Sequence, residues 1–163
     1  MKVAMFSWGA CFLACLIATE ARAEAWKALQ EAPTALVRAY KTDKESFLEA
    51  PSPKSARFLK VMTKGQIFPL YLVDPNSSSI CGSAGCLVVG YVYQNEQYKT
   101  VFSVYVNRPA PPRLPDNSFL VVSNKMKQGL PCLDVATGRA EKEYARWCYN
   151  GTKYTFNKVV KIK

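Results

Sequence analysis

Histidine is absent from the 163-residue sequence, and acidic residues are scarce, with 12 Asp and Glu against 22 Lys and Arg. Without an imidazole, the Ser–His and Cys–His nucleophile pairs, histidine-ligated zinc and a histidine pH switch are excluded. Hydrophobic residues make up 49% of the chain and charged residues 21%. This ordinary globular composition excludes a collagen, a long coiled coil and a fully disordered chain.

Long apolar runs are also scarce, and the one that stands out is near the start, from Val3 to Ala18. It is shorter than the roughly 20 residues that a membrane-spanning helix needs. Lys2 precedes it, and the small residues of Ala21-Arg22-Ala23 follow it with the spacing of a cleavage site. We therefore predict a secretory signal peptide over residues 1–23 and one exported domain over residues 24–163, periplasmic or secreted. A lipoprotein signal ending at Cys15 is the alternative.

Removal of residues 1–23 leaves 20 basic and 11 acidic residues, a formal net charge of +9. The remaining cysteines are even in number, and they are Cys81, Cys86, Cys132 and Cys148. In an exported chain, an even number of cysteines predicts disulfides, here two. A domain of this length buries about two thirds of its unfolded surface, so the bridges are expected to reinforce a core and not to replace one.

Helical spacing of apolar residues predicts two or three short helices between residues 24 and 65, with Pro33 suited to the first position of one of them. The last of these helices is expected over residues 55–62. Its outer face would carry four basic side chains, which are Lys54, Arg57, Lys60 and Lys64. A solvated helix face is the simplest interpretation of that charge.

After Gly65 the apolar residues alternate with a period of two, which predicts strands over 67–73, 87–93, 98–106, 119–123, 132–135, 144–149 and 152–160. The second and third of these are the longest and are expected at the centre of the sheet. Residues 94–97 read as a hairpin loop, 124–129 as a basic loop, and 107–117, with four prolines, as an irregular excursion. The predicted fold class is α+β, with N-terminal short helices packed on an antiparallel sheet of about five to seven strands.

Two local patterns predict how the C-terminal strands pair. Asn150-Gly151 is typical of a two-residue hairpin turn, which would place Trp147 opposite Tyr154. A direct bond between Cys132 and Cys148 would set a second register. That register places Leu133 against Trp147, Val135 against Ala145, and Asp134 against Arg146. Because it brings apolar residues together and opposes two charges, we predict the bonds Cys132–Cys148 and Cys81–Cys86.

The segment between Cys81 and Cys86 is unusual, because its residues Gly82, Ser83, Ala84 and Gly85 are all small. Two glycines allow the chain to fold back so that the flanking cysteines can be bridged. A redox couple is the alternative, but such couples keep two residues between cysteines at the start of a helix. A four-cysteine zinc site is disfavoured because an oxidising compartment removes the thiolates.

The run from Phe68 through the Cys-Gly-Ser-Ala-Gly-Cys loop to Tyr91, the segment Gly129 to Leu133 and the motif Trp147 to Tyr154 resemble a group of small exported bacterial proteins. A cysteine-bounded loop between strands is also similar to that of the periplasmic inhibitors of vertebrate lysozymes. The inhibitor loop carries a histidine and charged residues, which this loop lacks. The resemblance therefore carries no site residues to this chain.

Enzymatic residues are few. With the cysteines bridged and no histidine, the candidates are carboxylate pairs or a Ser–Lys pair. Asp74 near Ser77, Ser78 and Ser79 is the one polar concentration beside the unusual loop, but Asp-Pro-Asn-Ser is also an ordinary turn composition. We expect no catalytic residue, no cofactor and no metal.

A charge of +9 attracts anions, so we expect a binding module for an anionic envelope or extracellular partner, with Gly82, Ser83, Ala84, Gly85, Lys125 and Lys127 as candidate contact residues. The partner would be a protein or an anionic envelope component, and peripheral contact with a membrane surface is compatible with the charge. No specific nucleic acid is expected, because the aromatic residues alternate as core residues. The alternatives are an accessory or structural component of a secretion or conjugation apparatus, and a periplasmic enzyme inhibitor. The sequence leaves the oligomeric state open.

Overall fold

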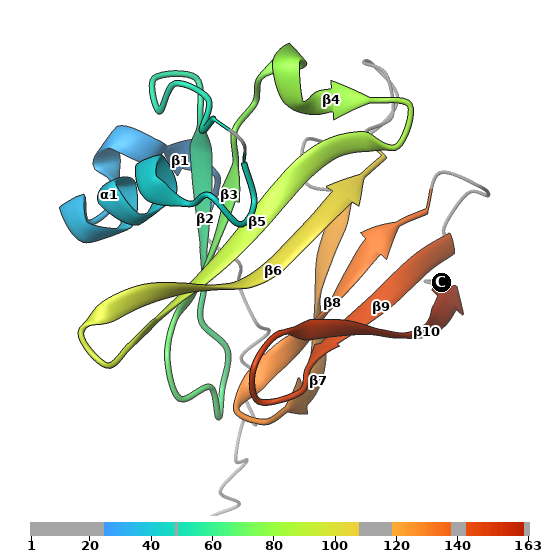
Figure 1. Cartoon of the computed structure of the whole chain (residues 1–163). Helices are drawn as coiled ribbons and strands as arrows, with labels where there is room; N and C mark the ends of the chain where they lie inside the picture. The colour runs from blue at the N-terminus through green and yellow to red at the C-terminus, as the bar shows by residue number, and fades with distance from the viewer. Residues whose placement is uncertain (1–24, 48, 108–118, 138–142, 162–163) are drawn as a thin grey trace, which may run out of the picture.

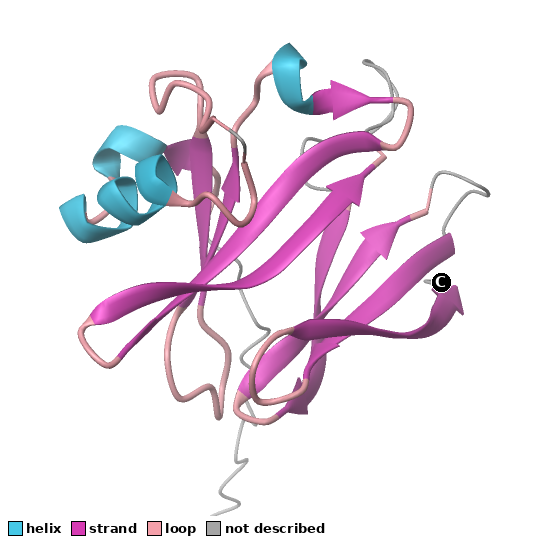
Figure 2. Cartoon of the chain, viewed as in Figure 1, coloured by secondary structure: helices cyan, strands magenta, loops and turns pink. Residues whose placement is uncertain are grey.

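The computed structural model describes residues 25–47, 49–107, 119–137 and 143–161 (Figure 1). The predicted signal peptide, the lipoprotein alternative at Cys15 and most of the proline-rich segment lie outside the described residues. Within those ranges, the chain forms two antiparallel sheets with a helical layer on one of them, as Figure 2 shows. In the same ranges there is no helix long and apolar enough to cross a membrane.

The first sheet has the strand order β1-β2-β3-β5-β4, and β6 pairs with β5. Its strands are β1 (Lys27–Ala28), β2 (Arg57–Val61), β3 (Leu70–Asp74), β4 (Cys81–Gly82), β5 (Gly85–Gln94) and β6 (Gln97–Val106). The second sheet has the order β10-β9-β8-β7. Its strands are β7 (Leu120–Lys127), β8 (Leu130–Ala136), β9 (Glu143–Tyr149) and β10 (Tyr154–Lys161). The helical elements are η1 (Leu29–Glu31), α1 (Thr34–Thr42) and η2 (Ser78–Ile80).

Alternation along the strands divides the interior into two cores. On β3, Leu70 and Leu72 belong to the core shared with the second sheet, whereas Tyr71 and Val73 belong to the core beneath α1. The helix contributes Leu36 and Tyr40 to that second core, and both side chains are fully buried. The first sheet is therefore buried on both faces, which explains why β3 reads as an almost continuous apolar run.

The prediction of two or three helices before residue 65 is not supported, since the described residues of that region contain one α-helix, α1, and the single turn of η1. Residues 57–61, expected to be helical, form strand β2, which pairs with β1 and β3. Phe58 faces the core under α1, while Leu59 and Val61 face the intersheet core. Burial on both faces gives this short segment an apolar spacing that does not distinguish a strand from a helix.

The expectation of one sheet with five to seven strands is also corrected, since the strands divide between two sheets. β5 and β6 are indeed the longest strands, but within the described residues β6 pairs with β5 alone and lies at an edge. Residues 124–127, expected in a loop, extend β7, and the turn consists of Gln128 and Gly129, both with positive φ. The β5–β6 hairpin turns in the same way at Asn95 and Glu96.

The register predicted from the Cys132–Cys148 bond is confirmed. Leu133 pairs with Trp147, Asp134 with Arg146 and Val135 with Ala145. Both predicted disulfides are present, Cys132–Cys148 and Cys81–Cys86. Asp134 is 2% exposed, and both of its oxygens accept hydrogen bonds at 2.7 Å from the Arg146 guanidinium. The ion pair therefore lies across β8 and β9, as the register requires.

The register predicted from Asn150-Gly151 is wrong. Tyr154 pairs with Tyr149 rather than with Trp147, so the connection has four residues. The Asn150 side-chain oxygen accepts hydrogen bonds at 2.9 Å from the backbone N–H groups of both Thr152 and Lys153. The backbone N–H of Asn150 donates to the Lys153 carbonyl. These local bonds favour the wider turn. As far as Phe156 and Trp147, the shift of two residues leaves the same side chains on each face of the hairpin. An irregularity between Phe156 and Lys158 then displaces the pairing by one further residue.

Candidate binding surfaces

The Cys81–Cys86 loop is a disulfide-closed hairpin in which the two cysteines pair directly across β4 and β5. Gly82, Ser83 and Ala84 are exposed, and Gly85 is half-buried. Gly85 has a φ of +106°, and a Cβ on it would lie 2.3 Å from the carbonyl oxygen of Val106 on β6. The glycine therefore allows the hairpin to lie directly against β6, which gives a small uncharged projection.

The two other candidate residues, Lys125 and Lys127, are exposed on β7 next to its turn into β8. Figure 1 places that turn at the opposite end of the molecule from β4. The structure thus does not bring the predicted contact residues together. They form two separate surfaces, one uncharged at the hairpin of Cys81 and Cys86 and one basic at the β7–β8 turn.

The β7–β8 turn lies beside the loop that connects β2 to β3. The backbone N–H of Ile67 in that loop donates to the Gly129 carbonyl at 3.2 Å, and the Thr63 hydroxyl lies 3.4 Å from the Met126 sulfur. We call the surface that the two segments form the basic tip. Its members are exposed side chains, namely Met62, Lys64, Ile67, Lys125, Met126 and Lys127.

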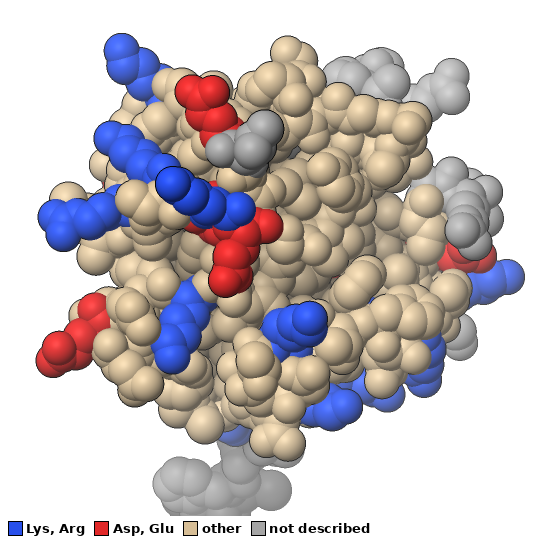
Figure 3. Space-filling model, in the orientation of Figure 1, with Lys and Arg blue, Asp and Glu red and all other residues tan. Residues whose placement is uncertain are grey.

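Neither segment of the basic tip contains an acidic residue, from Val61 to Leu70 or from Phe119 to Leu130. On the face drawn in Figure 3, several basic side chains lie along the lower right margin, below β10 in Figure 1. Of the six members of the basic tip, only Lys125 and Lys127 are predicted as contact residues from the sequence, which places Lys64 on a helix face. The signal that was overlooked is the pair of acid-free stretches, which acquires meaning only once the two segments are known to be adjacent.

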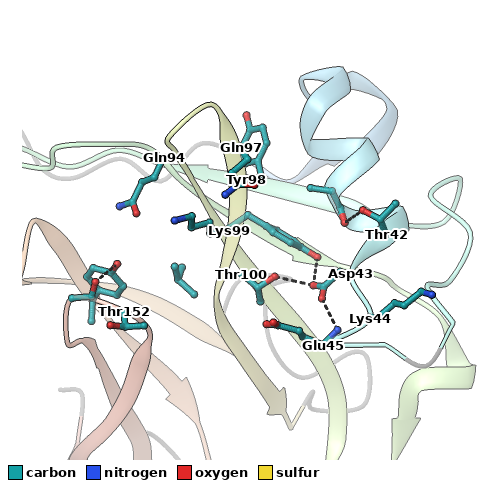
Figure 4. A pocket seen from close by; sticks show the side chains of 15 residues that line it. Thr42, Asp43, Lys44, Glu45, Gln94, Gln97, Tyr98, Lys99, Thr100 and Thr152 are labelled. Carbon is teal, nitrogen blue, oxygen red and sulfur yellow. Dashed lines mark hydrogen bonds between the residues drawn. The ribbon is translucent and has the colours of Figure 1, made fainter.

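A third surface is a groove of about 710 Å³ between α1, the β5–β6 hairpin and the β9–β10 turn (Figure 4). Its lining is polar and carries both signs of charge, including Lys44, Glu45 and Lys99. Smaller hollows have volumes of about 510 Å³, between residues 46–47, 49–52 and 79–80, and about 470 Å³, along β10. The mixed charge of the main groove indicates no single class of ligand.

Asp43 lies in this groove, but its carboxylate already accepts four hydrogen bonds. One oxygen accepts from the backbone N–H groups of Glu45 and Ser46, and the other from the hydroxyls of Tyr91 at 2.8 Å and Thr100 at 3.0 Å. Burial, followed by the nearby Asp43 charge, raises the pKa of Tyr91, so its hydroxyl remains a donor. Asp43 therefore joins the end of α1 to β5 and β6.

The polar concentration around Asp74 is likewise used in structural contacts. The Asp74 side chain is fully buried and accepts a hydrogen bond at 2.9 Å from Arg57, which is thus paired with β3 and not displayed on a helix face. The backbone N–H of Asn76 donates to the other oxygen, while the Ser77 and Ser79 hydroxyls bond to each other. Among the described residues, no group of His, Cys, Asp and Glu side chains is arranged to hold a metal ion.

The two disulfides indicate an oxidising, extracytoplasmic environment. Comparison of the chain with protein-family models, with curated proteins and with solved structures finds no match. We therefore infer a function from the charge, the exposure and the geometry of the surfaces described above.

Proposed function

We propose that the protein is a periplasmic or secreted, non-enzymatic binding module whose partner is anionic. The observation that supports this proposal is the basic tip, where Lys64, Lys125 and Lys127 are exposed on two adjacent segments that contain no acidic residue. Exposed lysines gathered at one end attract an anionic partner more strongly than the same charges spread over a surface. The excess of basic residues in the whole chain adds to the field.

A second candidate function is contact with a protein partner through the Cys81–Cys86 hairpin, as an inhibitor or as an accessory part of an envelope assembly. The hairpin supports it because three of its four loop residues are exposed and the bridge limits their conformations. A contact loop that is ordered before binding loses less entropy on association. This surface carries no charge, so it does not account for the basic composition.

The proposal is tested by elution from immobilised heparin, a sulfated polyanion, over a range of salt concentrations. The double variant K125Q/K127Q removes two charges from the basic tip, and K41Q/K54Q removes two exposed charges elsewhere. Loss of two lysine–anion contacts should lower the salt dependence of log K by about two, because each contact releases about one counterion. K41Q/K54Q should change it little. Equal effects from the two variants, or heparin binding that does not change with salt concentration, would contradict the proposal.

A further inference from the structure

The basic tip combines its lysines with exposed apolar side chains. Ile67 is 67% exposed, Met62 49% and Met126 37%. A polyanion such as a nucleic acid is held largely through its charges and gains little from aliphatic side chains. An anionic lipid surface, in contrast, accepts apolar side chains at the boundary between headgroups and acyl chains while its headgroups attract lysines. The composition of the tip matches the lipid surface.

The loop that carries Ile67 is held in one shape from within. Gln66 is 8% exposed, and its side-chain nitrogen donates to the carbonyls of Val61 at 3.0 Å and Phe68 at 2.6 Å. Its side-chain oxygen accepts from the Thr63 backbone N–H at 2.9 Å and from the Thr63 hydroxyl at 3.2 Å. The exposure of Ile67 is therefore a property of a cross-linked loop, and insertion would require no rearrangement of the backbone.

Contacts between the two segments also bring Ile67 and Met126 to the same end of the molecule. Gly129 has a φ of +80°, and a Cβ on it would lie 2.7 Å from the terminal carbon of Ile67. Ile67 thus rests on the backbone of the β7–β8 turn, close to where Met126 meets Thr63. Lys125 and Lys127 flank Met126 on β7, so their side chains project from the other face of that strand at the same end of the molecule.

We propose that the basic tip docks on an anionic membrane surface. The three apolar side chains enter the boundary beneath the headgroups, and the three lysines contact the anionic headgroups. This inference rests on the proposed function and names its partner as a lipid bilayer. Docking is peripheral, because only side chains at the end of the two sheets take part.

The test uses the exported protein after removal of its signal peptide, mixed with sedimenting vesicles of phosphatidylcholine alone or with an equal part of phosphatidylglycerol. We expect binding to the vesicles that contain phosphatidylglycerol and little binding to phosphatidylcholine. Ile67→Ser should weaken vesicle binding by about tenfold, since most of one aliphatic side chain is no longer buried. The matched control is Val159→Ser, which removes an aliphatic side chain 52% exposed on β10 and should leave binding unchanged.

Heparin retention of the same variants separates the two proposals. Ile67→Ser should leave heparin retention unchanged, because it removes no charge. The melting temperature of this variant should equal that of the unmodified protein. Retention on heparin without binding to phosphatidylglycerol vesicles would overturn membrane docking and leave the proposed function standing. Equal losses of vesicle binding from Ile67→Ser and Val159→Ser would also overturn it. Failure to bind either heparin or vesicles at low salt would overturn both.

Discussion

Polar residues that are buried, such as Asp74 and Gln66, or half-buried, such as Asp43, each tie together segments of this protein. Asp43 links the end of α1 to β5 and β6, Asp74 links β3 to Arg57 on β2, and Gln66 closes the loop between β2 and β3. Each makes several hydrogen bonds, as a buried polar group must if its desolvation is to be compensated. Removal of one such residue leaves its partners buried without a bond.

The first prediction concerns Asp43. Asp43→Ala should lower the free energy of unfolding by about 2–3 kcal/mol, because the buried Tyr91 hydroxyl and two backbone N–H groups lose their acceptor. Asp43→Asn keeps one oxygen acceptor and should cost less. Urea denaturation of the two variants measures the difference. Glu45→Ala, at an exposed neighbouring position, is the control, and a loss at Asp43 no larger than the loss at Glu45 would refute the assignment.

Among the elements, the hairpins show that both the local turn sequence and the pairing of the strands determine how the chain turns. The β5–β6 and β7–β8 hairpins have two-residue turns with positive φ at both positions, although neither has the Asn-Gly sequence. The Asn150-Gly151 sequence instead gives a wider connection. Asn95 suits the positive φ of its turn position, whereas strand pairing along β5 and β6, ten residues on each side, outweighs the cost of a positive φ at Glu96.

The two disulfides are expected to contribute unequally. Replacing both Cys132 and Cys148 with Ala should destabilise the protein by about 3 kcal/mol, because their bond closes the longer loop, and further loss comes from their burial. Replacing Cys81 and Cys86 should lower the melting temperature less, since that bond closes only a short hairpin at the surface. Thermal unfolding followed by circular dichroism compares the two. Equal melting losses would contradict the ranking.

The Cys81 and Cys86 variant also tests the second candidate function. If the hairpin contacts a protein partner, capture of that partner from envelope extract should weaken while heparin retention stays the same. A loss of heparin retention would instead indicate that the hairpin contacts the anionic partner. We do not expect this result, because the hairpin and the basic tip lie at opposite ends of the molecule.

The molecule as a whole has three layers, with α1 on one face of the first sheet and the second sheet on its other face (Figure 1). Tyrosines lie at several points in these layers, and burial raises the pKa values of Tyr40, Tyr91 and Tyr154 above their usual value of 10.0. Burial, followed by the neighbouring Tyr71, raises the pKa of Tyr98 to about 12. In alkaline solution, the folded protein therefore retains phenolic protons at a pH where the unfolded chain has already released them.

Above neutral pH, the free energy of unfolding should consequently only fall as the pH rises. With no histidine and with the four cysteines of the domain bridged, the free energy of unfolding should stay nearly constant from about pH 6 to pH 9. Above pH 10 the unfolded state binds fewer protons than the folded state, so stability should fall as the pH rises toward 12. Chemical denaturation at a series of pH values measures this. A Tyr98→Phe variant should show a shallower fall, whereas a sharp change near pH 7 would contradict the account.

By itself the sequence determined the antiparallel strands of the C-terminal two thirds, both disulfides and the register of β8 against β9. These features follow from alternation over short distances, and in the last case from a covalent bond that only one register satisfies together with the Asp134–Arg146 pair. Lys125 and Lys127 were also predicted as contact residues, because the sequence places them in a basic segment of a strongly basic chain.

Only the tertiary structure decided that residues 57–61 form a strand, that the strands divide between two sheets, and that Ile67 lies beside Gly129. Each depends on contacts between segments far apart in the chain. A segment buried on both faces has an apolar pattern compatible with helix or strand, and its strand partner decides between them. The basic tip is of the same kind, because two short acid-free stretches become one amphipathic surface only when a backbone hydrogen bond joins them.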